Sequence, residues 1–321
     1  MKNYLITGGA GFIGSNLADK LLSENNSVIV LDNMTENYSL KLKEANINRN
    51  INNENYKFYK ADIRNRAEIE QIFKENEIDT VIHLAGLAGV RNSIDTPLLY
   101  EEVNCMGTQN ILDCMRENNI NNIVFASSSS VYGNRKREPF KETDDTDYPI
   151  SPYAATKKAD ELFLYVYHNL YKFNTMILRF FTVYGPRQRE DLAISKFVKA
   201  ILEDNAIQMY GDGSTARDYT YVDDIIDGIE KSIKYLQDKD EVYEILNIGE
   251  STPITLKDMI KTIEDKVGKK AKIDQLPMQA GDVNITYANI EKAKKLIGYQ
   301  PKVSFEEGIE NFVKWFKENY K

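Results

Sequence analysis

Short apolar runs alternate with longer helical stretches through the first half of the chain. The apolar runs cover residues 4–7, 28–31, 57–59, 80–84 and 123–126. Between them, residues 12–22, 67–75 and 98–117 place apolar side chains at helical spacing. Strands that alternate with helices are typical of βαβ units, and consecutive Val and Ile residues fit strands covered on both faces. We therefore predict an α/β fold built on a parallel sheet.

The pattern changes beyond residue 185, where the apolar runs become shorter. Turn signals stand at Gly211-Asp212-Gly213, at Gly249 and at Gly281-Asp282. We predict a Rossmann-type, doubly wound sheet over residues 1–185, to which some later segments return. A smaller, interleaved α/β lobe is predicted over residues 186–321. Two polar stretches, residues 46–57 and 134–147, are predicted to be surface loops.

Composition narrows the classes of function. The 321 residues carry 41 Lys and Arg against 49 Asp and Glu, a net charge of −8, which argues against a nucleic-acid binder. Two cysteines (Cys105, Cys114) and two histidines (His83, His168) are too few for a disulfide framework, a histidine-rich metal site or Ser-His-Asp chemistry. No apolar run reaches the ~20 residues of a membrane span, and the chain starts with a predicted strand rather than a signal segment. We expect no metal, no membrane association and a cytoplasmic location.

A glycine-rich turn follows the first predicted strand and opens the first predicted helix. Gly8, Gly11 and Gly14 permit a tight turn, close approach to a pyrophosphate and close helix packing, and the helix N-terminus supplies N–H groups to phosphates. Asp32 ends the second predicted strand. Its carboxylate would bind ribose hydroxyls and repel a 2′-phosphate. We therefore predict bound NAD rather than NADP; a plain strand-to-helix turn is the alternative.

Further cofactor contacts are expected at the same edge of the sheet. Phe12 and Ile13 lie inside the glycine motif, and Asn33 follows the second strand. Asp62 and Ile63 follow the third strand and would cap the adenine. For Asp62 a helix N-cap is an equally good interpretation.

Ser128, Tyr153 and Lys157 form a candidate catalytic group. Tyr153 and Lys157 are four residues apart in a predicted helix over residues 151–171, which puts both side chains on one face. A free Tyr has a pKa near ~10, and an adjacent ammonium favours the phenolate; Lys157 would also hold the nicotinamide ribose. Ser128 follows the strand at residues 123–126, where open parallel sheets bind ligands. We predict that Tyr153 removes a proton from a substrate hydroxyl while hydride leaves the same carbon for NAD.

The spacing Gly-x-x-Gly-x-x-Gly resembles that of the extended short-chain dehydrogenases/reductases, which modify nucleotide sugars. The resemblance covers nearly the whole chain and includes His83-Leu-Ala-Gly86, Asn104 with Gly107-Thr108, Leu178-Arg-Phe-Phe-Thr-Val-Tyr-Gly-Pro186, Arg217-Asp-Tyr-Thr-Tyr-Val-Asp-Asp224 and Gln279-Ala-Gly-Asp-Val283. The chain looks like a UDP-sugar 4-epimerase and is most similar to the UDP-glucuronate 4-epimerases. In that family C4 is oxidised, the 4-keto sugar rotates and hydride returns to the other face, so NAD stays bound and is not consumed.

The resemblance also implies individual roles. The NAD site would be lined by Leu84, Ala85, Asn104 and Phe181. Arg217 would meet the UDP pyrophosphate, although a surface ion pair with its neighbour Asp218 is the alternative. Asp282 would meet the uridine ribose, with Gln279 among the substrate contacts. The helices over residues 98–117 and 151–171 resemble the pair through which family members form a homodimer by a four-helix bundle.

Three features separate the subfamilies. Ser129 and Ser130 stand where related sugar-nucleotide 4,6-dehydratases carry an Asp-Glu pair, so elimination lacks its acid and base. Thr182 matches the glucuronate enzymes, whereas the pattern of the UDP-glucose 4-epimerases has Asn at this position. Arg91 and Arg189 fall in segments that flank the sugar pocket in the family. Together with the three hydroxyls they would bind a C6 carboxylate; contact with diphosphate or solvent alone is the alternative.

We therefore expect NAD-dependent epimerisation of UDP-glucuronate to UDP-galacturonate. The main alternative is a UDP-glucose or UDP-N-acetylglucosamine 4-epimerase, and a UDP-glucuronate decarboxylase and a non-catalytic NAD sensor are less favoured. The 4-keto form of glucuronate is a β-keto acid, which loses CO₂ when its carboxylate bond aligns with the carbonyl. We expect Ser129, Thr182 and Arg189 to hold that bond out of alignment.

Overall fold

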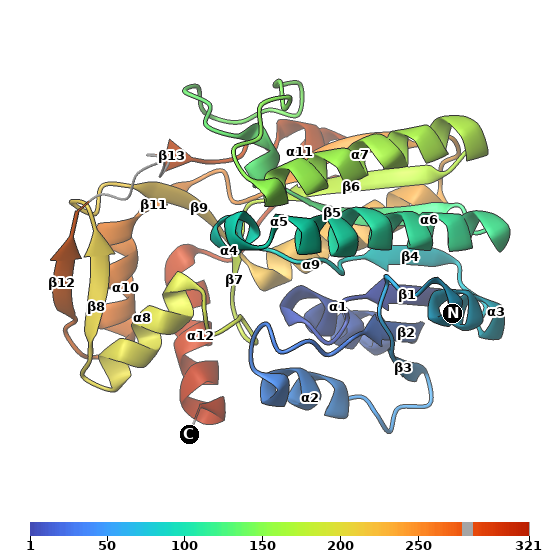
Figure 1. Ribbon diagram of the computed structural model, residues 1–321. Coiled ribbons are helices and arrows are strands. Elements are labelled where there is room, and N and C mark those ends of the chain that lie inside the picture. Colours follow the sequence, from blue (N-terminus) through green and yellow to red (C-terminus); the bar gives the residue numbers. More distant parts are fainter. Residues whose placement is uncertain (278–284, 321) are drawn as a thin grey trace.

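Seven parallel strands form the main sheet in a computed structural model that describes residues 1–277 and 285–320. Their order is β10-β6-β5-β4-β1-β2-β3 (Figure 1). In that order the strands are Tyr243–Ile248, Asn174–Phe180, Asn122–Ser128, Thr80–His83, Asn3–Thr7, Ser27–Asp32 and Tyr56–Lys60. The predicted doubly wound sheet is confirmed. The direction of winding reverses between β1 and β4, and ligands bind beyond the carboxyl ends of the strands at such a point.

Helices cover both faces of this sheet. One face carries α1 and α9, and the other carries α3, α6 and α7, with α6 and α7 side by side (Figure 1). These helices are Phe12–Ser23 (α1), Val222–Gln237 (α9), Arg66–Glu75 (α3), Gly107–Glu117 (α6) and Pro152–Tyr171 (α7). Ile6 and Val30 enter the apolar core on the α1 face, whereas their neighbours Leu5 and Leu31 enter the core on the α6 face. Successive strand residues point to opposite faces, which explains why these strands are apolar at every position.

The predicted helix over residues 98–117 is not a uniform α-helix. It consists of α5 (Pro97–Tyr100), the π-helical turn η1 (Glu101–Met106) and α6. Asn104 lies in η1 and is 1% exposed. Its side-chain oxygen accepts the Leu87 N–H at 2.7 Å, and its amide donates to the Thr156 hydroxyl at 3.0 Å. Turns of this kind are frequent at functional sites, and here the turn carries a side chain that holds a loop of the ligand cavity.

The polar stretch over residues 46–57 was predicted to be a loop, and this is wrong at both ends, since strand β3 already begins at Tyr56. Helix α2 spans Leu40–Asn48. Asn46 is buried because its side-chain amide donates to the carbonyl of Ala10 in the glycine turn, at 3.0 Å. The other predicted loop, residues 134–147, is described throughout and contains no helix and no strand beyond an isolated bridge.

A smaller lobe stands beside the carboxyl ends of the main strands (Figure 1). It contains a sheet of β7, β9, β11 and β13, the strand pair β8 and β12, and the helices α8, α10 and α12. Their bounds are Thr182–Tyr184 (β7), Ala216–Tyr221 (β9), Pro253–Thr255 (β11), Ile285–Thr286 (β13), Ala206–Tyr210 (β8), Lys272–Leu276 (β12), Ala193–Leu202 (α8), Leu256–Val267 (α10) and Phe305–Asn319 (α12). Strand β10 returns to the main sheet between these segments, so the two parts are interleaved along the chain.

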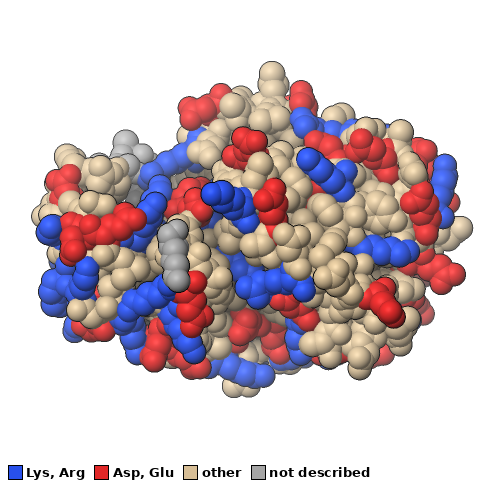
Figure 2. Space-filling view, turned by 90° about the horizontal axis from the view of Figure 1, so that it is seen from below, with Lys and Arg blue, Asp and Glu red and all other residues tan. Residues whose placement is uncertain are grey.

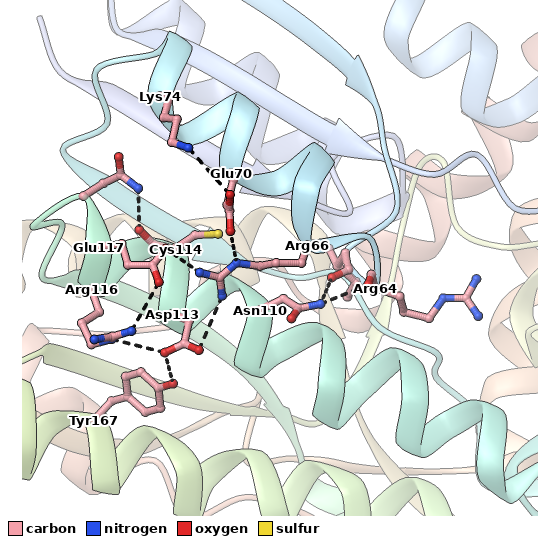
Figure 3. Close-up of polar contacts among 12 residues, drawn as sticks. Arg64, Arg66, Glu70, Lys74, Asn110, Asp113, Cys114, Arg116, Glu117 and Tyr167 are labelled. Carbon is pink, nitrogen blue, oxygen red and sulfur yellow. Dashed lines mark hydrogen bonds and ion pairs between the residues drawn. The ribbon is translucent and has the colours of Figure 1, made fainter.

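A network of charged side chains joins α3 to α6 and α7 (Figure 3). Arg66 on α3 donates to Glu70 at 2.9 Å and lies 3.5 Å from Asp113 on α6. Tyr167 on α7 donates its hydroxyl to Asp113 at 2.7 Å. These contacts fix α7 against its neighbours at the end away from its first turn.

Acidic and basic side chains are intermixed over the face shown in Figure 2. The net charge of −8 is therefore not gathered into a single acidic surface there. Within residues 1–277 and 285–320, no helix combines the length and the apolar character that crossing a membrane requires.

Candidate active site

A cavity of about 1090 Å³ opens beyond the carboxyl ends of β1, β2, β4 and β5. Its wall combines the glycine turn, the strand ends, the first turn of α7 and residues of the small lobe. The predicted site residues that line it are Gly8, Gly11, Phe12, Ile13, Gly14, Asp32, Asn33, Ile63, Leu84, Ala85, Arg91, Ser128, Ser129, Ser130, Tyr153, Phe181, Thr182, Arg189 and Arg217. Most of the predicted cofactor and substrate contacts therefore lie around one space.

The glycine turn brings the backbone close to this space. Gly8 has a φ of +71°, and a Cβ there would lie 2.8 Å from the backbone nitrogen of Ala85. A Cβ at Gly14 would overlap the carbonyl oxygen of Gly8. Helix α1 begins after Gly11 with no side-chain cap, so its first N–H groups and its positive dipole end are available to a phosphate.

Asp32 is held at the cavity edge by the backbone. Its carboxylate is 7% exposed and accepts N–H groups from Ala10 at 3.2 Å and from Met34 at 2.9 Å. The Lys43 ammonium lies 3.5 Å from the same carboxylate and 4.8 Å from the Tyr38 ring centroid. A ribose at this edge would therefore meet an oriented carboxylate with a cation beside it.

Lys43 and Tyr38 line the cavity, and the sequence reasoning missed both. They lie in α2 and in the turn before it, which carry no recognised motif. A signal existed only indirectly, because a carboxylate buried as deeply as Asp32 needs a counter-charge. Helix α2 contains two lysines, Lys41 and Lys43. Lys41 is exposed, whereas Lys43 is buried, with 4% of its surface exposed.

Three predicted cofactor residues, Asp62, Asn104 and Lys157, do not line the cavity, and the first two hold residues of its wall. Asp62 accepts two hydrogen bonds from Arg64, at 3.0 and 2.7 Å, and one from Asn33 at 3.0 Å. The hydrogen bonds from Arg64 lower the pKa of Asp62 to about 2. The alternative role of Asp62 as a helix cap is wrong, because the N-cap of α3 is Asn65. Asn104 holds the loop at Leu87 as described above.

Two predicted substrate contacts, Gln279 and Asp282, lie outside the described residues. Arg217 lines the cavity from β9 of the small lobe. Its guanidinium also donates to the Ala216 carbonyl at 2.9 Å.

Ser128 and Tyr153 reach the cavity from different elements. Ser128 ends β5, and Tyr153 lies in the first turn of α7. The start of α7 is fixed by Ser151, whose hydroxyl accepts the Ala154 N–H at 3.1 Å. Burial raises the pKa of Tyr153, and the neighbouring Ser128 hydroxyl lowers it. The phenolate form of Tyr153 therefore depends on nearby groups that favour it.

Lys157 is the cation closest in sequence to Tyr153 on the same helix face. Its side chain is 5% exposed, and its ammonium lies 4.7 Å from the Phe125 ring centroid. A Cβ at Gly86 would stand 3.4 Å from this ammonium, so the glycine leaves room beside it. Burial lowers the pKa of Lys157, and the carboxylate of Asp160 raises it.

A buried ion pair anchors α7 to the sheet. Glu161, four residues after Lys157, accepts two hydrogen bonds from Arg179 of β6, at 2.9 and 2.7 Å. Both side chains are 2% exposed. Ser127 of β5 adds a third hydrogen bond to Glu161 at 2.6 Å. Because Ser127 precedes Ser128, this cluster ties the helix of Tyr153 to the strand of Ser128.

Hydroxyl and guanidinium groups line the same cavity, where the Arg189 guanidinium lies 5.6 Å from the Tyr38 ring centroid. Ser129 and Ser130 begin the 3₁₀ turn η2 (Ser129–Tyr132), and Thr182 begins β7. The Arg189 guanidinium forms two hydrogen bonds with Asp191, at 2.9 and 2.7 Å, which fixes its direction. Arg91 lies in α4, which spans Val90–Asp95. These groups suit a carboxylate better than a neutral substituent.

His83 does not belong to the catalytic group. It is fully buried at the end of β4, and its ring nitrogens lie 2.6 Å from the Thr7 hydroxyl and 3.0 Å from the Thr108 hydroxyl. Burial lowers the pKa of His83 to about 3. The imidazole is therefore neutral at physiological pH and joins β1, β4 and α6.

The parallel sheet, the glycine turn and the cavity at the strand ends define the class of dinucleotide-binding enzymes. Residues 5–312 match the family model described as GDP-mannose 4,6 dehydratase. A UDP-glucuronate 4-epimerase of Thermodesulfobacterium geofontis is 44% identical over 320 residues, which are 99% of this chain and 97% of that enzyme.

Two solved structures extend the comparison. The UDP-glucuronic acid 4-epimerase from Bacillus cereus, in complex with UDP-glucuronic acid and NAD, has a TM-score of 0.92 at 35% identity and covers 99% of this chain and 100% of its own. The UDP-N-acetylglucosamine 4-epimerase from Methanobrevibacter ruminantium has a TM-score of 0.90 at 34% identity, with coverage of 99% and 98%. The chain belongs to the extended short-chain dehydrogenase/reductase family, in its UDP-sugar 4-epimerase branch.

Proposed function

We propose that this enzyme interconverts UDP-glucuronate and UDP-galacturonate by epimerisation at C4, with NAD as a resident cofactor. One observation carries the proposal. The cavity that holds Ser128 and Tyr153 continues into a wall that contains Ser129, Thr182 and Arg189. Such a wall would offer a substrate carboxylate its partners in the cavity that holds the proposed proton-transfer group. The names of the similar enzymes, which include UDP-glucuronate, support the same substrate.

The residues present fit NAD. The glycine turn leaves no room for side chains where the backbone would meet the pyrophosphate, and the Asp32 carboxylate favours ribose hydroxyls over a 2′-phosphate. Leu84 and Ala85 from β4 and its loop, and Phe181 after β6, line the same cavity. Bound NAD would supply the hydride acceptor and donor for the chemistry at C4.

Tyr153 supplies the proton transfer in this proposal. Its oxygen takes the proton of the C4 hydroxyl and later returns it, while the Ser128 hydroxyl holds the substrate oxygen in line. Lys157, one helical turn away, favours the phenolate by its positive charge. Neutral His83 takes no part. Serines at positions 129 and 130 provide neither acid nor base, so the dehydration named in the family model's description has no means of proceeding here.

Holding the substrate carboxylate is the second task of the site. The 4-keto form of the substrate is a β-keto acid and loses CO₂ when its carboxylate bond aligns with the carbonyl. Hydrogen bonds from Ser129 and Thr182, with the charge of Arg189, fix the rotation of that bond. Asp191 holds the Arg189 fork in one direction, so the charge does not follow the carboxylate as the sugar ring turns.

Product analysis tests the proposed function. Purified protein is incubated separately with UDP-glucuronate, UDP-glucose and UDP-N-acetylglucosamine, and the nucleotide sugars are resolved by chromatography. UDP-galacturonate should form from UDP-glucuronate without added NAD. Tyr153→Phe should keep bound NAD and lose turnover. Faster turnover of UDP-glucose or UDP-N-acetylglucosamine would overturn the substrate assignment, and no turnover of any sugar would favour an NAD sensor.

We also propose that two copies pair through α5, η1 and α7. Leu162, Val166 and Leu170 recur every four residues along α7 and are 55%, 45% and 65% exposed. Leu98 and Met106 on the neighbouring helical segment are 72% and 44% exposed. Apolar residues at this spacing on two adjacent helices match half of a four-helix bundle.

The oligomeric state tests this pairing. Leu162→Glu combined with Val166→Glu should convert the protein from dimer to monomer in size-exclusion chromatography with light scattering. Ile51→Glu changes an apolar side chain of similar exposure, 49%, far from these helices, and should leave the dimer intact. A wild-type protein of monomer mass would refute the proposal.

The two parts of the chain are proposed to bind different ligands. Residues 1–185, which carry the glycine turn, Asp32 and the catalytic group, would bind NAD. Residues 186–321, which contribute Arg189 and Arg217 to the cavity, would bind the UDP-sugar. A cytoplasmic location agrees with two cysteines that remain free thiols in the structure.

A further inference from the structure

A fully buried carboxyl group lies one helical turn beyond Lys157. Asp160 of α7 has no exposed surface. Among the described residues, neither of its carboxyl oxygens has a hydrogen-bond partner. A buried carboxyl group without such partners is costly, and nothing in the roles assigned above uses it. Its position beside the catalytic group therefore calls for an explanation.

The groups around Asp160 come from three elements. On α7 the neighbours are Lys157 and Glu161; on η1 the Cys105 thiol faces it; and on α6 the Thr108 hydroxyl faces it. Glu161 is already bound to Arg179. The Thr108 hydroxyl is hydrogen-bonded to neutral His83 at 3.0 Å, and the Cys105 thiol donates to the Thr156 carbonyl at 3.7 Å. Lys157 is thus the charged group in this set that can compensate the carboxylate.

The charges of Lys157 and Asp160 interact in a part of the interior from which water is excluded. The ammonium of Lys157 lies outside ion-pair contact with Asp160 in the described structure, since no nitrogen–oxygen distance within 4 Å joins them. Lys157 and Asp160 are three residues apart on α7, so their side chains are neighbours on one helix face, and charges so placed interact strongly where water is excluded. Burial raises the pKa of Asp160 to about 7 against the lowering effect of the ammonium, so the carboxylate form prevails above that pH, and reciprocally the carboxylate raises the pKa of Lys157.

We propose that Asp160 is a positioning residue of the catalytic group, whose buried carboxylate is the counter-charge that keeps Lys157 an ammonium ion. The proposal rests on the function proposed above for Lys157. Without that counter-charge, burial among Phe125 and the apolar core would favour the neutral amine. A neutral amine would neither favour the Tyr153 phenolate nor offer three donors to a ribose.

Asp160 also acts directly on Tyr153. Burial is the main reason that the pKa of Tyr153 is raised, and the charge of Asp160 adds to that rise. Loss of the carboxylate removes this contribution, and where Lys157 loses its proton it also removes a positive charge that favours the phenolate. These two effects on Tyr153 oppose each other, so the test is made on the pKa of Lys157.

The direct experiment titrates Lys157 itself. NAD-loaded protein with carbon-13 at lysine Cε is followed by NMR from pH 6 to 11, and the Lys157 signal is assigned with Lys157→Arg. In Asp160→Asn the midpoint should fall by about one pH unit or more, the size expected for loss of a nearby opposite charge. Asp227→Asn removes the same charge from α9, where Asp227 pairs with Lys231 at 2.7 Å, and should not move the midpoint.

An unchanged Lys157 midpoint in Asp160→Asn would overturn the proposal. If that variant does not retain NAD, Asp160→Ser is titrated in the same way. The kinetic companion measures kcat against pH on UDP-glucuronate: the alkaline limb, where Lys157 loses its proton, should shift toward acid in Asp160→Asn, whereas a purely structural role would lower the amplitude without shifting that limb. The NMR titration needs no turnover. An inactive wild-type protein would therefore refute the proposed function, and the effect of Asp160 on the pKa of Lys157 could still be measured.

Discussion

The buried pair of Arg179 and Glu161 offers the sharpest test of how the catalytic helix is held. Arg179→Met removes a guanidinium that makes two hydrogen bonds to Glu161 and lies 4.8 Å from the Tyr132 ring centroid. Glu161, 2% exposed, would then keep one hydrogen bond, from Ser127. Breaking a buried pair by removing one partner costs about 3–5 kcal/mol, because the remaining charge is left uncompensated. We expect that loss in the free energy of unfolding.

The thermal midpoint measures this loss. At about 2 °C per kcal/mol for a chain of this length, Arg179→Met should lower the midpoint by about 6–10 °C, measured at the same saturating NAD concentration for every variant because a bound ligand shifts the midpoint. Arg116→Met is the matched control. Arg116 is 39% exposed and lies 3.3 Å from Asp113, so its loss should cost at most about 1 kcal/mol.

The double variant decides the physical reason. Glu161→Gln with Arg179→Met removes both charges and should recover at least half of the stability lost in Arg179→Met. A midpoint drop no larger than that of Arg116→Met would show that the pair does not anchor α7. A double variant no more stable than Arg179→Met would show that the lost packing against Tyr132, and not the uncompensated charge, is the cause.

Three further predictions concern the site and the lobe behind it. Thr182→Ala removes the hydrogen bond that we propose for the substrate carboxylate, and CO₂ release relative to epimerisation should rise about tenfold, the worth of a hydrogen bond to a charged group; unchanged partitioning in a product assay would contradict this. Asp32→Ser keeps a hydrogen-bond acceptor for the backbone but removes the carboxylate that lies 3.5 Å from the Lys43 ammonium. The ammonium is then free to attract a 2′-phosphate, so the ratio of NADP to NAD retained should rise at least about tenfold. Equal ratios in the variant and the wild type would refute the roles assigned to Asp32 and Lys43. Burial raises the pKa of Glu250 to about 7, above its unfolded value, so ionisation costs stability as pH rises from about 4 through 7. Glu250→Gln should therefore raise the thermal midpoint at pH 8, with a gain that shrinks toward pH 5, and a gain independent of pH would exclude this cause.

Sequence reasoning located the parts of the site whose chemistry is local. The glycine turn needs Gly8 and Gly14 within seven residues of each other, and Tyr153 and Lys157 share a face because four residues make about one helical turn. Asp32 and Ser128 follow from the rule that ligands meet the carboxyl ends of parallel strands. In each case the signal lies within one element or at its end.

The tertiary structure decided what depends on pairing between distant elements. Lys43 reaches Asp32 because α2 packs beside the glycine turn, and no spacing in the sequence announces it. The π-helical turn at Asn104 is invisible to periodicity because the apolar positions on either side continue a helical pattern.

The sequence by itself determined the sheet, the cofactor turn and the Ser-Tyr-Lys group, since backbone periodicity and motif chemistry act over a few residues. Only the tertiary structure decided how these parts are held. Arg179 meets Glu161 because β5 and β6 align Ser127 opposite Arg179. Water is excluded around Asp160 and Lys157 because η1 and α6 cover that side of α7. Burial and counter-charge are properties of packed surroundings, which the order of residues along the chain does not display.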